Sequence, residues 1–91
     1  MKILWIDDEI SDLGAVIELL KSEGFDVETA ENGFEGIKKV KEKTYDFILL
    51  DYKMPNLDGI EVLKVINSIR PNVPVIMLTA ISDKEIIEKA I

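Results

Sequence analysis

The stretch FILLDYKMPNLDG, residues 47–59, decides the predicted fold, because it runs four apolar residues directly into a carboxylate. A run that is apolar at every position is typical of a strand covered on both faces in a parallel sheet. A Lys-Met-Pro turn then carries the chain away, and Gly59 is expected to let the backbone turn into the next helix. Asp51 is therefore expected at the carboxyl end of a buried strand.

Strand and helix patterns alternate along the rest of the chain. Before this stretch we expect a strand at residues 3–6, a helix capped by Ser11 and stopped by Gly24, an edge strand at residues 25–30, and a helix with the apolar stripe Phe34, Ile37 and Val40. After it we expect a helix with the stripe Ile60, Leu63 and Ile66, a strand at residues 75–78, and a last helix beginning near Ser82-Asp83. Strands that alternate with helices require right-handed crossovers, so the predicted class is α/β with an open parallel sheet.

Composition indicates a small acidic domain. The 91 residues carry a formal net charge of −7 and 47% hydrophobic residues, which predicts one globular domain over residues 1–91. No cluster of Lys and Arg is present to neutralise phosphates, so direct nucleic-acid binding is not expected. Cysteine and histidine are absent, which excludes Ser-His and Cys-His nucleophiles and His-ligated zinc. We find neither a signal-peptide layout nor a membrane-spanning run, and we expect a cytoplasmic protein without a membrane partner.

Oxygen-bearing side chains follow three of the predicted strands. Asp7 and Asp8 follow the first strand, Asp51 follows the third, and Thr79 follows the fourth. If these strands are neighbours, the side chains meet beyond the carboxyl ends of the sheet, where ligands of such sheets gather. Carboxylates held close repel one another unless a cation lies between them or one of them takes up a proton. A hard cation such as Mg²⁺ (or Mn²⁺) suits these ligands, and Asp51 is then a candidate nucleophile that accepts a phosphoryl group.

Three sequence motifs together favour this chemistry over a simpler role for Asp51. Taken alone, an Asp after a strand is usually a turn former or a helix cap. The stretches WIDDE (residues 5–9), DFILLDYKMPNLDG (residues 46–59) and VPVIMLTA (residues 73–80) occur here in this order. With them the chain resembles a response-regulator receiver domain, the phosphoacceptor module of two-component signalling, over essentially its whole length. The resemblance implies a flavodoxin-like, doubly wound sheet with four strands in the order 2-1-3-4 and about four helices.

The resemblance also assigns roles to individual residues. It implies that Asp51 is the phosphorylation site, that Asp8 binds the metal directly, and that Asp7 binds it mainly through water. The backbone carbonyl of Lys53 is implied as a further metal ligand, and Thr79 as the hydroxyl that moves to the bound phosphoryl group. The implied partner is a histidine kinase or a phosphotransfer protein. No independent enzyme is implied beyond self-phosphorylation from a phosphodonor and slow autodephosphorylation.

The chain departs from the family pattern at its C-terminal end. Family members continue with a fifth strand, which carries an active-site lysine, and with a fifth helix, so we expect a receiver domain truncated before this unit. Lys53 is the only lysine near Asp51 in sequence. Two functions stay open. The acid group favours a phosphoacceptor domain, whereas the missing lysine favours a receiver-derived interaction or dimerisation module with little or no phosphotransfer.

Truncation of this kind leads us to expect a homodimer. Without a fifth strand, residues 75–78 would be an unpaired apolar edge that can pair with another chain. Without a fifth helix, we expect Ile3, Trp5, Ile48 and Leu50 to be uncovered in part. A symmetric dimer would then form through the edge, through the bared face or by exchange of a C-terminal helix.

Overall fold

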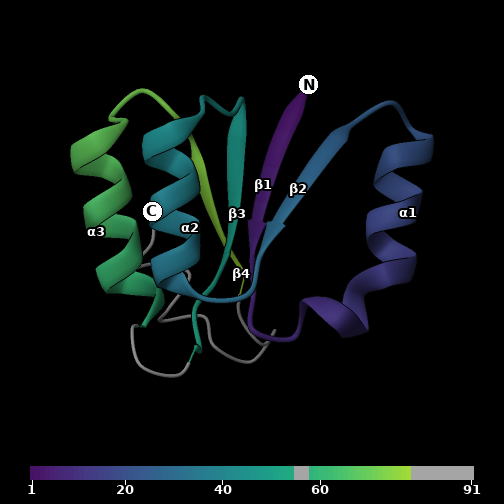
Figure 1. Cartoon of the computed structure of the whole chain (residues 1–91), viewed down its shortest axis with the longest axis horizontal. Helices are drawn as coiled ribbons and strands as arrows, with labels where there is room; N and C mark the ends of the chain where they lie inside the picture. Colours follow the sequence, from purple (N-terminus) through teal and green to yellow (C-terminus); the bar gives the residue numbers. More distant parts are fainter. Residues whose placement is uncertain (55–57, 79–91) are drawn as a thin grey trace.

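The protein is a three-layer α/β structure in a computed structural model that describes residues 1–54 and 58–78 (Figure 1). The elements in chain order are β1 (Lys2–Ile6), a 3₁₀ helix (Ile10–Leu13), α1 (Gly14–Ser22), β2 (Asp26–Ala30), α2 (Gly33–Glu42), β3 (Phe47–Asp51), α3 (Gly59–Ile69) and β4 (Val75–Leu78). The strands pair in parallel in the order β2-β1-β3-β4. This confirms the predicted class and strand order. The helix predicted near Ser82-Asp83 lies outside the described residues.

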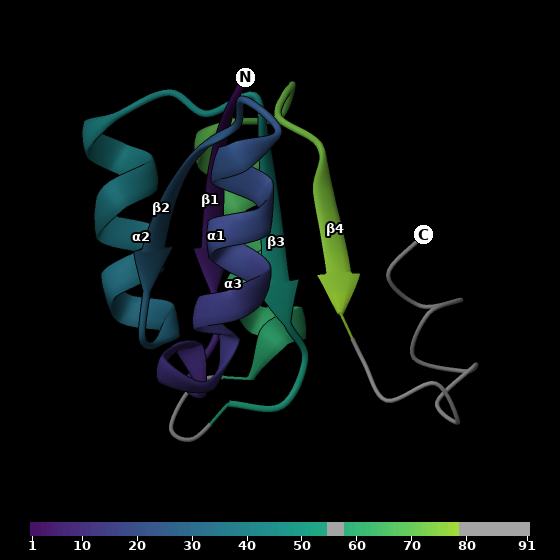
Figure 2. The same ribbon diagram turned by 90° about the vertical axis from the view of Figure 1, so that its right-hand side faces the viewer.

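The helices cover the two faces of the sheet unequally. α2 and α3 lie on one face, and α1 lies on the other, in front of β1 and β2 (Figures 1 and 2). Both faces of β1 are therefore covered, and its residues Ile3, Leu4, Trp5 and Ile6 are all buried. Ile48 and Leu50 are also fully buried. The expectation that Ile3, Trp5, Ile48 and Leu50 are uncovered is thus wrong, because described elements already cover them.

The first helical segment begins differently from the prediction. Ser11 lies within a short 3₁₀ helix, and α1 begins only at Gly14. Leu13 takes the N-cap position of α1 and makes no side-chain cap hydrogen bond, so Ser11 is not the cap. The predicted stop is confirmed, because α1 ends at Ser22 and Gly24 follows with a φ of 96°. No helix within residues 1–54 and 58–78 has the length and apolarity needed to cross a membrane.

The apolar stripe of α2 differs from the prediction at Phe34. Phe34 is 62% exposed, whereas Gly33, Gly36 and Val40 are the buried residues of this helix. At Gly36 the helix lies so close to the sheet that an added Cβ would overlap the side chain of Ile6. Val40 is buried and Ile37 packs against the same core, so the predicted stripe is confirmed at these two residues and wrong at Phe34. The two glycines that share the buried face carry no hydrophobic signal, so the periodicity of the larger side chains did not reveal them.

The predicted stripe of α3 is confirmed at Leu63 and Ile66 and is less buried at Ile60. Val62 and Ile66 are fully buried, and Leu63 is packed partly against the same core. Ile60, which we expected in the stripe, is only half-buried. The helix ends at Ile69, shortly before Pro71 and Pro74, which cannot continue it.

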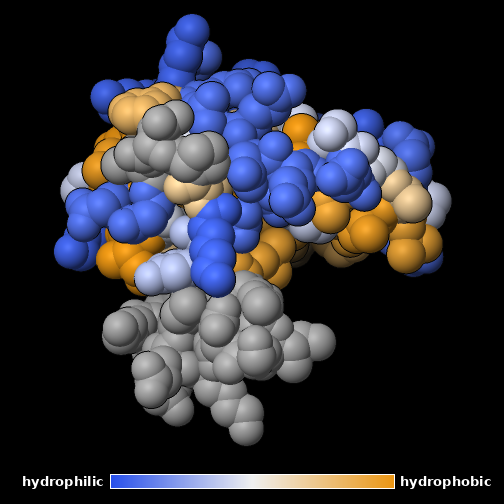
Figure 3. Space-filling view, turned by 90° about the horizontal axis from the view of Figure 1, so that it is seen from below, coloured by the Kyte–Doolittle hydropathy of each residue, from blue (hydrophilic) through white to orange (hydrophobic). Residues whose placement is uncertain are grey.

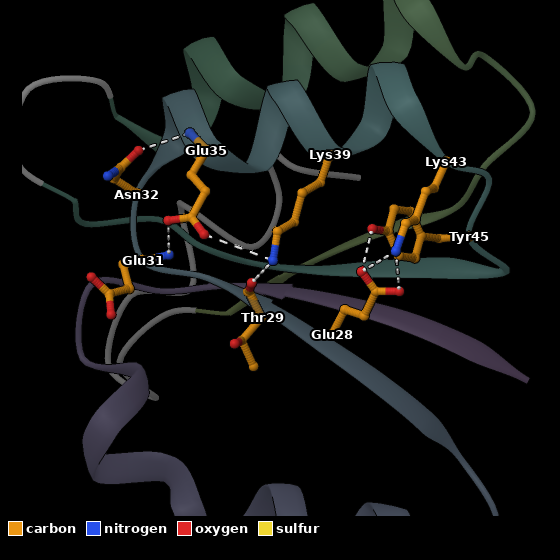
Figure 4. Close-up of polar contacts among 8 residues, drawn as sticks. All are labelled: Glu28, Thr29, Glu31, Asn32, Glu35, Lys39, Lys43 and Tyr45. Atoms are coloured by element: carbon orange, nitrogen blue, oxygen red, sulfur yellow. Dashed lines mark hydrogen bonds and ion pairs between the residues drawn. The ribbon is translucent and has the colours of Figure 1, made fainter.

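Polar contacts connect α2 to the end of β2 (Figure 4). Asn32 caps α2, because its side chain accepts a hydrogen bond from the backbone N–H of Glu35 at 2.8 Å. The Glu35 carboxylate in turn accepts from the backbone N–H of Glu31 at 3.2 Å and lies 3.7 Å from the Lys39 ammonium. Lys39 donates to the carbonyl of Thr29. These contacts hold the turn that follows β2 in place beside the carboxyl end of the sheet.

A second polar cluster surrounds Glu28 of β2 (Figure 4). Its carboxylate accepts hydrogen bonds from Lys43 at 3.2 Å and from the Tyr45 hydroxyl at 3.1 Å, and it lies 3.1 Å from the Lys2 ammonium. Burial opposes ionisation of Glu28, but these three partners together lower its pKa. Burial, followed by the hydrogen bond to Glu28, raises the pKa of Tyr45 to about 12. The cluster joins β1, β2 and the segment between α2 and β3.

Candidate metal centre at the strand ends

Three carboxylates meet at the carboxyl ends of β1 and β3. Asp7, Asp8 and Asp51 each offer an oxygen, and these oxygens all lie within 4.8 Å of one another. Asp7 and Asp51 are half-buried, whereas Asp8 is exposed. The sequence predicted this meeting, because β1 and β3 are neighbours in the sheet and run in the same direction.

The backbone after β1 fixes the position of Asp7. Its N–H donates to the carbonyl of Ala30 at 3.0 Å, which continues the pairing of β1 with β2. Its carboxylate oxygen Oδ1 accepts from the backbone N–H of Glu9 at 2.9 Å. One oxygen of Asp7 is therefore engaged by the turn, whereas the exposed Asp8 contributes its oxygen to the carboxylate group.

Asp51 is the last residue of β3 and has an unusual protonation equilibrium. Burial, and next the negative charge of Asp7, raises its pKa to about 6. Asp8 raises this pKa further through its own carboxyl group, whereas the backbone N–H of Lys53, 3.4 Å from Oδ1 of Asp51, acts in the opposite direction. The site therefore concentrates negative charge that a cation would offset.

The loop after β3 is held by backbone hydrogen bonds. The N–H of Tyr52 donates to the carbonyl of Leu78 in β4 at 3.0 Å, and the carbonyl of Tyr52 accepts from the N–H of Gly59 at 2.9 Å. Asp58 caps α3, because its side chain accepts from the backbone N–H of Glu61 at 3.0 Å. Tyr52 is thus linked to β4 on one side and to the first residue of α3 on the other.

Thr79 is the one candidate residue whose placement lies outside the described residues. It directly follows Leu78, which pairs with Asp51 in the β3–β4 register. Its predicted role therefore stays a prediction.

The chemistry of the donor set fits a hard divalent cation. Carboxylate oxygens are the ligands that Mg²⁺ and Mn²⁺ prefer, and neither cysteine nor histidine is present to favour a softer ion. Lys53 lies two residues after Asp51, and the role of its backbone carbonyl as a ligand stays a prediction. Seen from the carboxyl ends of the strands, the described surface is largely hydrophilic at its centre, with hydrophobic residues on the side of α1 (Figure 3).

Comparison with known proteins decides the family. The family model described as "Response regulator receiver domain" matches residues 3–91. The chain belongs to the response regulator receiver domain family. Such domains belong to two-component signalling systems, so the resemblance found in the sequence is confirmed.

Curated relatives of this receiver domain are transcriptional regulators. The chain is 52% identical over 79 residues to the transcriptional regulatory protein CpxR homolog of Haemophilus influenzae, covering 87% of this chain and 34% of that protein. It is 42% identical over 80 residues to the transcriptional regulatory protein ZraR of Klebsiella oxytoca, covering 88% of this chain and 18% of that protein. The receiver domain thus spans about a third or less of the length of these two relatives.

Solved receiver structures share the fold. The response regulator TrrA of Thermotoga maritima, solved in complex with Mg²⁺ and BeF, superposes with a TM-score of 0.84 at 36% identity, covering 98% of this chain and 79% of that one. A receiver domain protein from Clostridium thermocellum superposes with a TM-score of 0.88 at 37% identity, covering 98% and 72%. These likenesses confirm the flavodoxin-like parallel sheet.

The sequence did not reveal which residues hold the site in shape. Gly59 was expected to supply conformational freedom for a turn, but Gly24 alone among the described residues has a positive φ. The ammonium of Lys39 donates to the carbonyl of Thr29. In the sequence, the only indication that Gly59 has a structural role was its position directly after Asp58, which caps α3. For Lys39 the only indication was its spacing of four residues from Glu35.

Proposed function

We propose that residues 1–91 form a phosphoacceptor receiver domain that takes a phosphoryl group onto Asp51 in the presence of Mg²⁺. The observation that carries this proposal is the meeting of Asp7, Asp8 and Asp51 within 4.8 Å at the ends of neighbouring strands, in a chain of the receiver family. The TrrA structure, with Mg²⁺ and BeF bound, supports it by analogy.

Each residue of the site has a proposed part. Asp8, which is exposed, would bind the cation directly, together with Asp51 and the backbone carbonyl of Lys53. Asp7 would act mainly through water, since one of its oxygens already accepts from Glu9. When bound, Mg²⁺ supplies positive charge that offsets the negative charge of the carboxylates and of an incoming phosphoryl group. Thr79 is proposed to donate its hydroxyl to that group after transfer.

The proposed reaction is a phosphoryl transfer to a carboxylate. An oxygen of Asp51 attacks the phosphorus of a phosphohistidine, the P–N bond breaks, and the departing imidazole keeps the bonding electrons and takes up a proton. The product is an acyl phosphate on Asp51, which water hydrolyses slowly to the carboxylate and inorganic phosphate. The proposed phosphodonor is a histidine kinase or a phosphotransfer protein.

The second proposal for this chain is a receiver-derived interaction module with little or no phosphotransfer. The observation that favours it is that, within residues 1–54 and 58–78, no lysine side chain is hydrogen-bonded to or ion-paired with Asp51. Lys53 is exposed, and only its backbone N–H contacts Asp51 in the described structure. The two proposals differ in one outcome, which is whether a phosphodonor modifies Asp51.

Mg²⁺ addition should change the fluorescence of Trp5, and Asp8→Ala should remove this response. Trp5 is the only tryptophan, is 6% exposed, and lies in β1 two residues before Asp7. A cation between the carboxylates changes the electric field at the end of this strand. Loss of a direct ligand should weaken binding by at least the roughly 10–100-fold typical of outer-shell changes. A fluorescence titration with Mg²⁺ or Mn²⁺ measures the effect.

The control for this titration is Asp12→Ala, which removes an acidic residue of the 3₁₀ helix outside the carboxylate group. It should bind the cation as the wild-type chain does. An unchanged titration in Asp8→Ala, with circular dichroism showing an intact fold, would remove Asp8 as a ligand.

We also propose that this chain forms a symmetric homodimer through the edge of β4. The carbonyls of Pro74 and Leu78 accept from β3, so the alternate residues Val75 and Met77 direct their backbone groups to the other edge. No described strand pairs with that edge, and Ile76 is 49% exposed there. The strand carries no charged residue or proline that would discourage pairing. Burial of apolar surface, at about 25 cal/mol per Å², would favour the dimer.

Ile76→Lys should shift this dimer toward monomer by at least about 10-fold in dissociation constant, since two like charges would face each other across the two-fold axis. Light scattering coupled to size exclusion at two well-separated concentrations measures the mass. Leu19→Lys on α1 is the matched control, because Leu19 is 61% exposed and lies away from β4. A wild-type chain that stays monomeric at high concentration with cooperative unfolding would contradict the dimer.

A further inference from the structure

Two glycines occupy the same position in their helices but have opposite surroundings. Gly14 is the first residue of α1, and Gly59 is the first residue of α3. Neither has a positive φ, so neither is required for backbone freedom. A Cβ added at Gly14 would meet nothing within 4 Å, whereas one at Gly59 would stand 2.7 Å from the carbonyl oxygen of Asp51 and 2.7 Å from Cα of Tyr52. Gly59 is therefore required for space.

The three atoms nearest to a Cβ added at Gly59 are all backbone atoms. Besides the two at 2.7 Å, the carbonyl oxygen of Tyr52 would lie 3.0 Å from the added Cβ. A side chain could rotate away from such a contact, but a backbone that is also hydrogen-bonded cannot do so alone. The Tyr52 carbonyl accepts from Gly59, and the Tyr52 N–H donates to Leu78 at 3.0 Å. α3 thus rests directly on the peptide group that joins Asp51 to Tyr52.

We propose that Gly59 is a positioning residue for the cation site, through which α3 sets the distance between the Asp51 carboxylate and the Lys53 backbone. This inference rests on the proposed function, in which that carboxylate and the Lys53 carbonyl bind the same ion. Tyr52 connects the two ligand residues, and its peptide groups are held by Gly59 on one side and by β4 on the other. The N–H of Lys53 already lies 3.4 Å from Oδ1 of Asp51.

The size of the backbone shift that an alanine at position 59 requires determines whether cation binding is affected. An alanine at position 59 must lengthen its 2.7 Å contacts to more than 3.0 Å and reaches ordinary van der Waals contact at 3.4 Å, a movement of about 0.3–0.7 Å. Binding groups have to be held to within about 0.5 Å of their productive geometry. Mg²⁺ requires near-ideal octahedral geometry at short distances, whereas Ca²⁺ accepts longer and more variable ones. The shift should therefore harm Mg²⁺ binding more than Ca²⁺ binding.

The test compares Gly59→Ala with Gly14→Ala in fluorescence titrations of Trp5 with Mg²⁺ and with Ca²⁺. Both variants add one methyl group at the first residue of a helix, and only the one at position 59 meets backbone atoms. We expect the dissociation constant for Mg²⁺ to rise about 10-fold in Gly59→Ala, that for Ca²⁺ to rise less than about 3-fold, and both to stay unchanged in Gly14→Ala. A merely structural role would lower stability in urea and leave the ratio of the two constants unchanged.

The other outcomes separate the inference from the proposed function. If the wild-type chain binds neither ion, the proposed function fails. If the wild-type chain binds Mg²⁺ and Gly59→Ala binds it equally well, the inference is overturned while the proposed function stands. Should Gly59→Ala unfold in buffer, the titrations are repeated in sucrose, which favours the compact state. A variant that stays unfolded in sucrose would assign Gly59 to folding and also overturn the inference.

Discussion

Acetyl phosphate and Mg²⁺ should add one phosphoryl group to the wild-type chain, and Asp51→Asn should receive none. The amide of asparagine is a poor nucleophile and cannot form the acyl phosphate, so the loss should be complete rather than partial. Modification of the wild-type chain should depend on Mg²⁺, because the carboxylates around Asp51 otherwise repel the incoming phosphoryl group. Intact-mass measurement detects the adduct directly.

The control for this experiment is Asp46→Asn. Asp46 directly precedes β3, so it lies at the opposite end of that strand from Asp51. Asp46 accepts a hydrogen bond from the backbone N–H of Lys2, and asparagine keeps that acceptor. This variant should be phosphorylated like the wild-type chain. Absence of any adduct with acetyl phosphate or beryllofluoride, in a wild-type chain that still binds the metal, would favour the interaction module instead.

Asp51→Asn should also stabilise the metal-free protein by about 1–2 kcal/mol at pH 8. Burial and the charge of Asp7 raise the pKa of Asp51 to about 6 in the folded protein. A pKa raised on folding means that the neutral carboxyl group favours the folded state below pH 4 and that this contribution is lost as pH rises through 6. A tenfold change in proton affinity corresponds to about 1.4 kcal/mol, and the partial exposure of Asp51 reduces the total.

Urea unfolding at two pH values measures this effect. The stability difference between variant and wild type should be near zero at pH 4 and should appear between pH 4 and pH 7. Saturating Mg²⁺ should reverse the order at pH 8, because an ion at about 100 times its dissociation constant stabilises the wild-type chain by about 2.7 kcal/mol. Equal stability of the two proteins at pH 8 without metal would show that the carboxylates do not strain the folded state.

The sequence predicted the strands and the acid group better than the helices. β1 is covered on both faces, whereas Phe47 and Leu49 of β3 are only half-buried, but both strands are continuous apolar runs that end at an aspartate. The meeting of Asp7 with Asp51 follows from this, because adjacent parallel strands end at the same edge. Strand order itself came from the resemblance to the family, since apolar runs alone do not say which strand lies beside which.

The helix faces were harder to predict because they depend on how closely each helix approaches the sheet. At Gly36 the approach brings Ile6 into contact with helix backbone, which turns Phe34 out to solvent. The role of Gly59 was hidden for the same reason: a missing side chain leaves no pattern, and its contacts with Asp51 and Tyr52 exist only after the chain folds. The hydrogen bonds and ion pairs of Glu28 were hidden as well, because their partners are distant from Glu28 in sequence.

The central place of β1 in the sheet has a consequence for synthesis of the chain. β1 is made first, yet one of its two neighbours is β3, and Asp7 and Asp51 stand 44 positions apart. A ribosome adds about 5–20 residues per second, so the acid pair leaves the exit tunnel seconds before Asp51 does. During that interval the nascent chain holds half of a cation site. At the proposed site a divalent ion would gain its third carboxylate only when β3 pairs with β1, so metal occupancy would report that these two strands have paired.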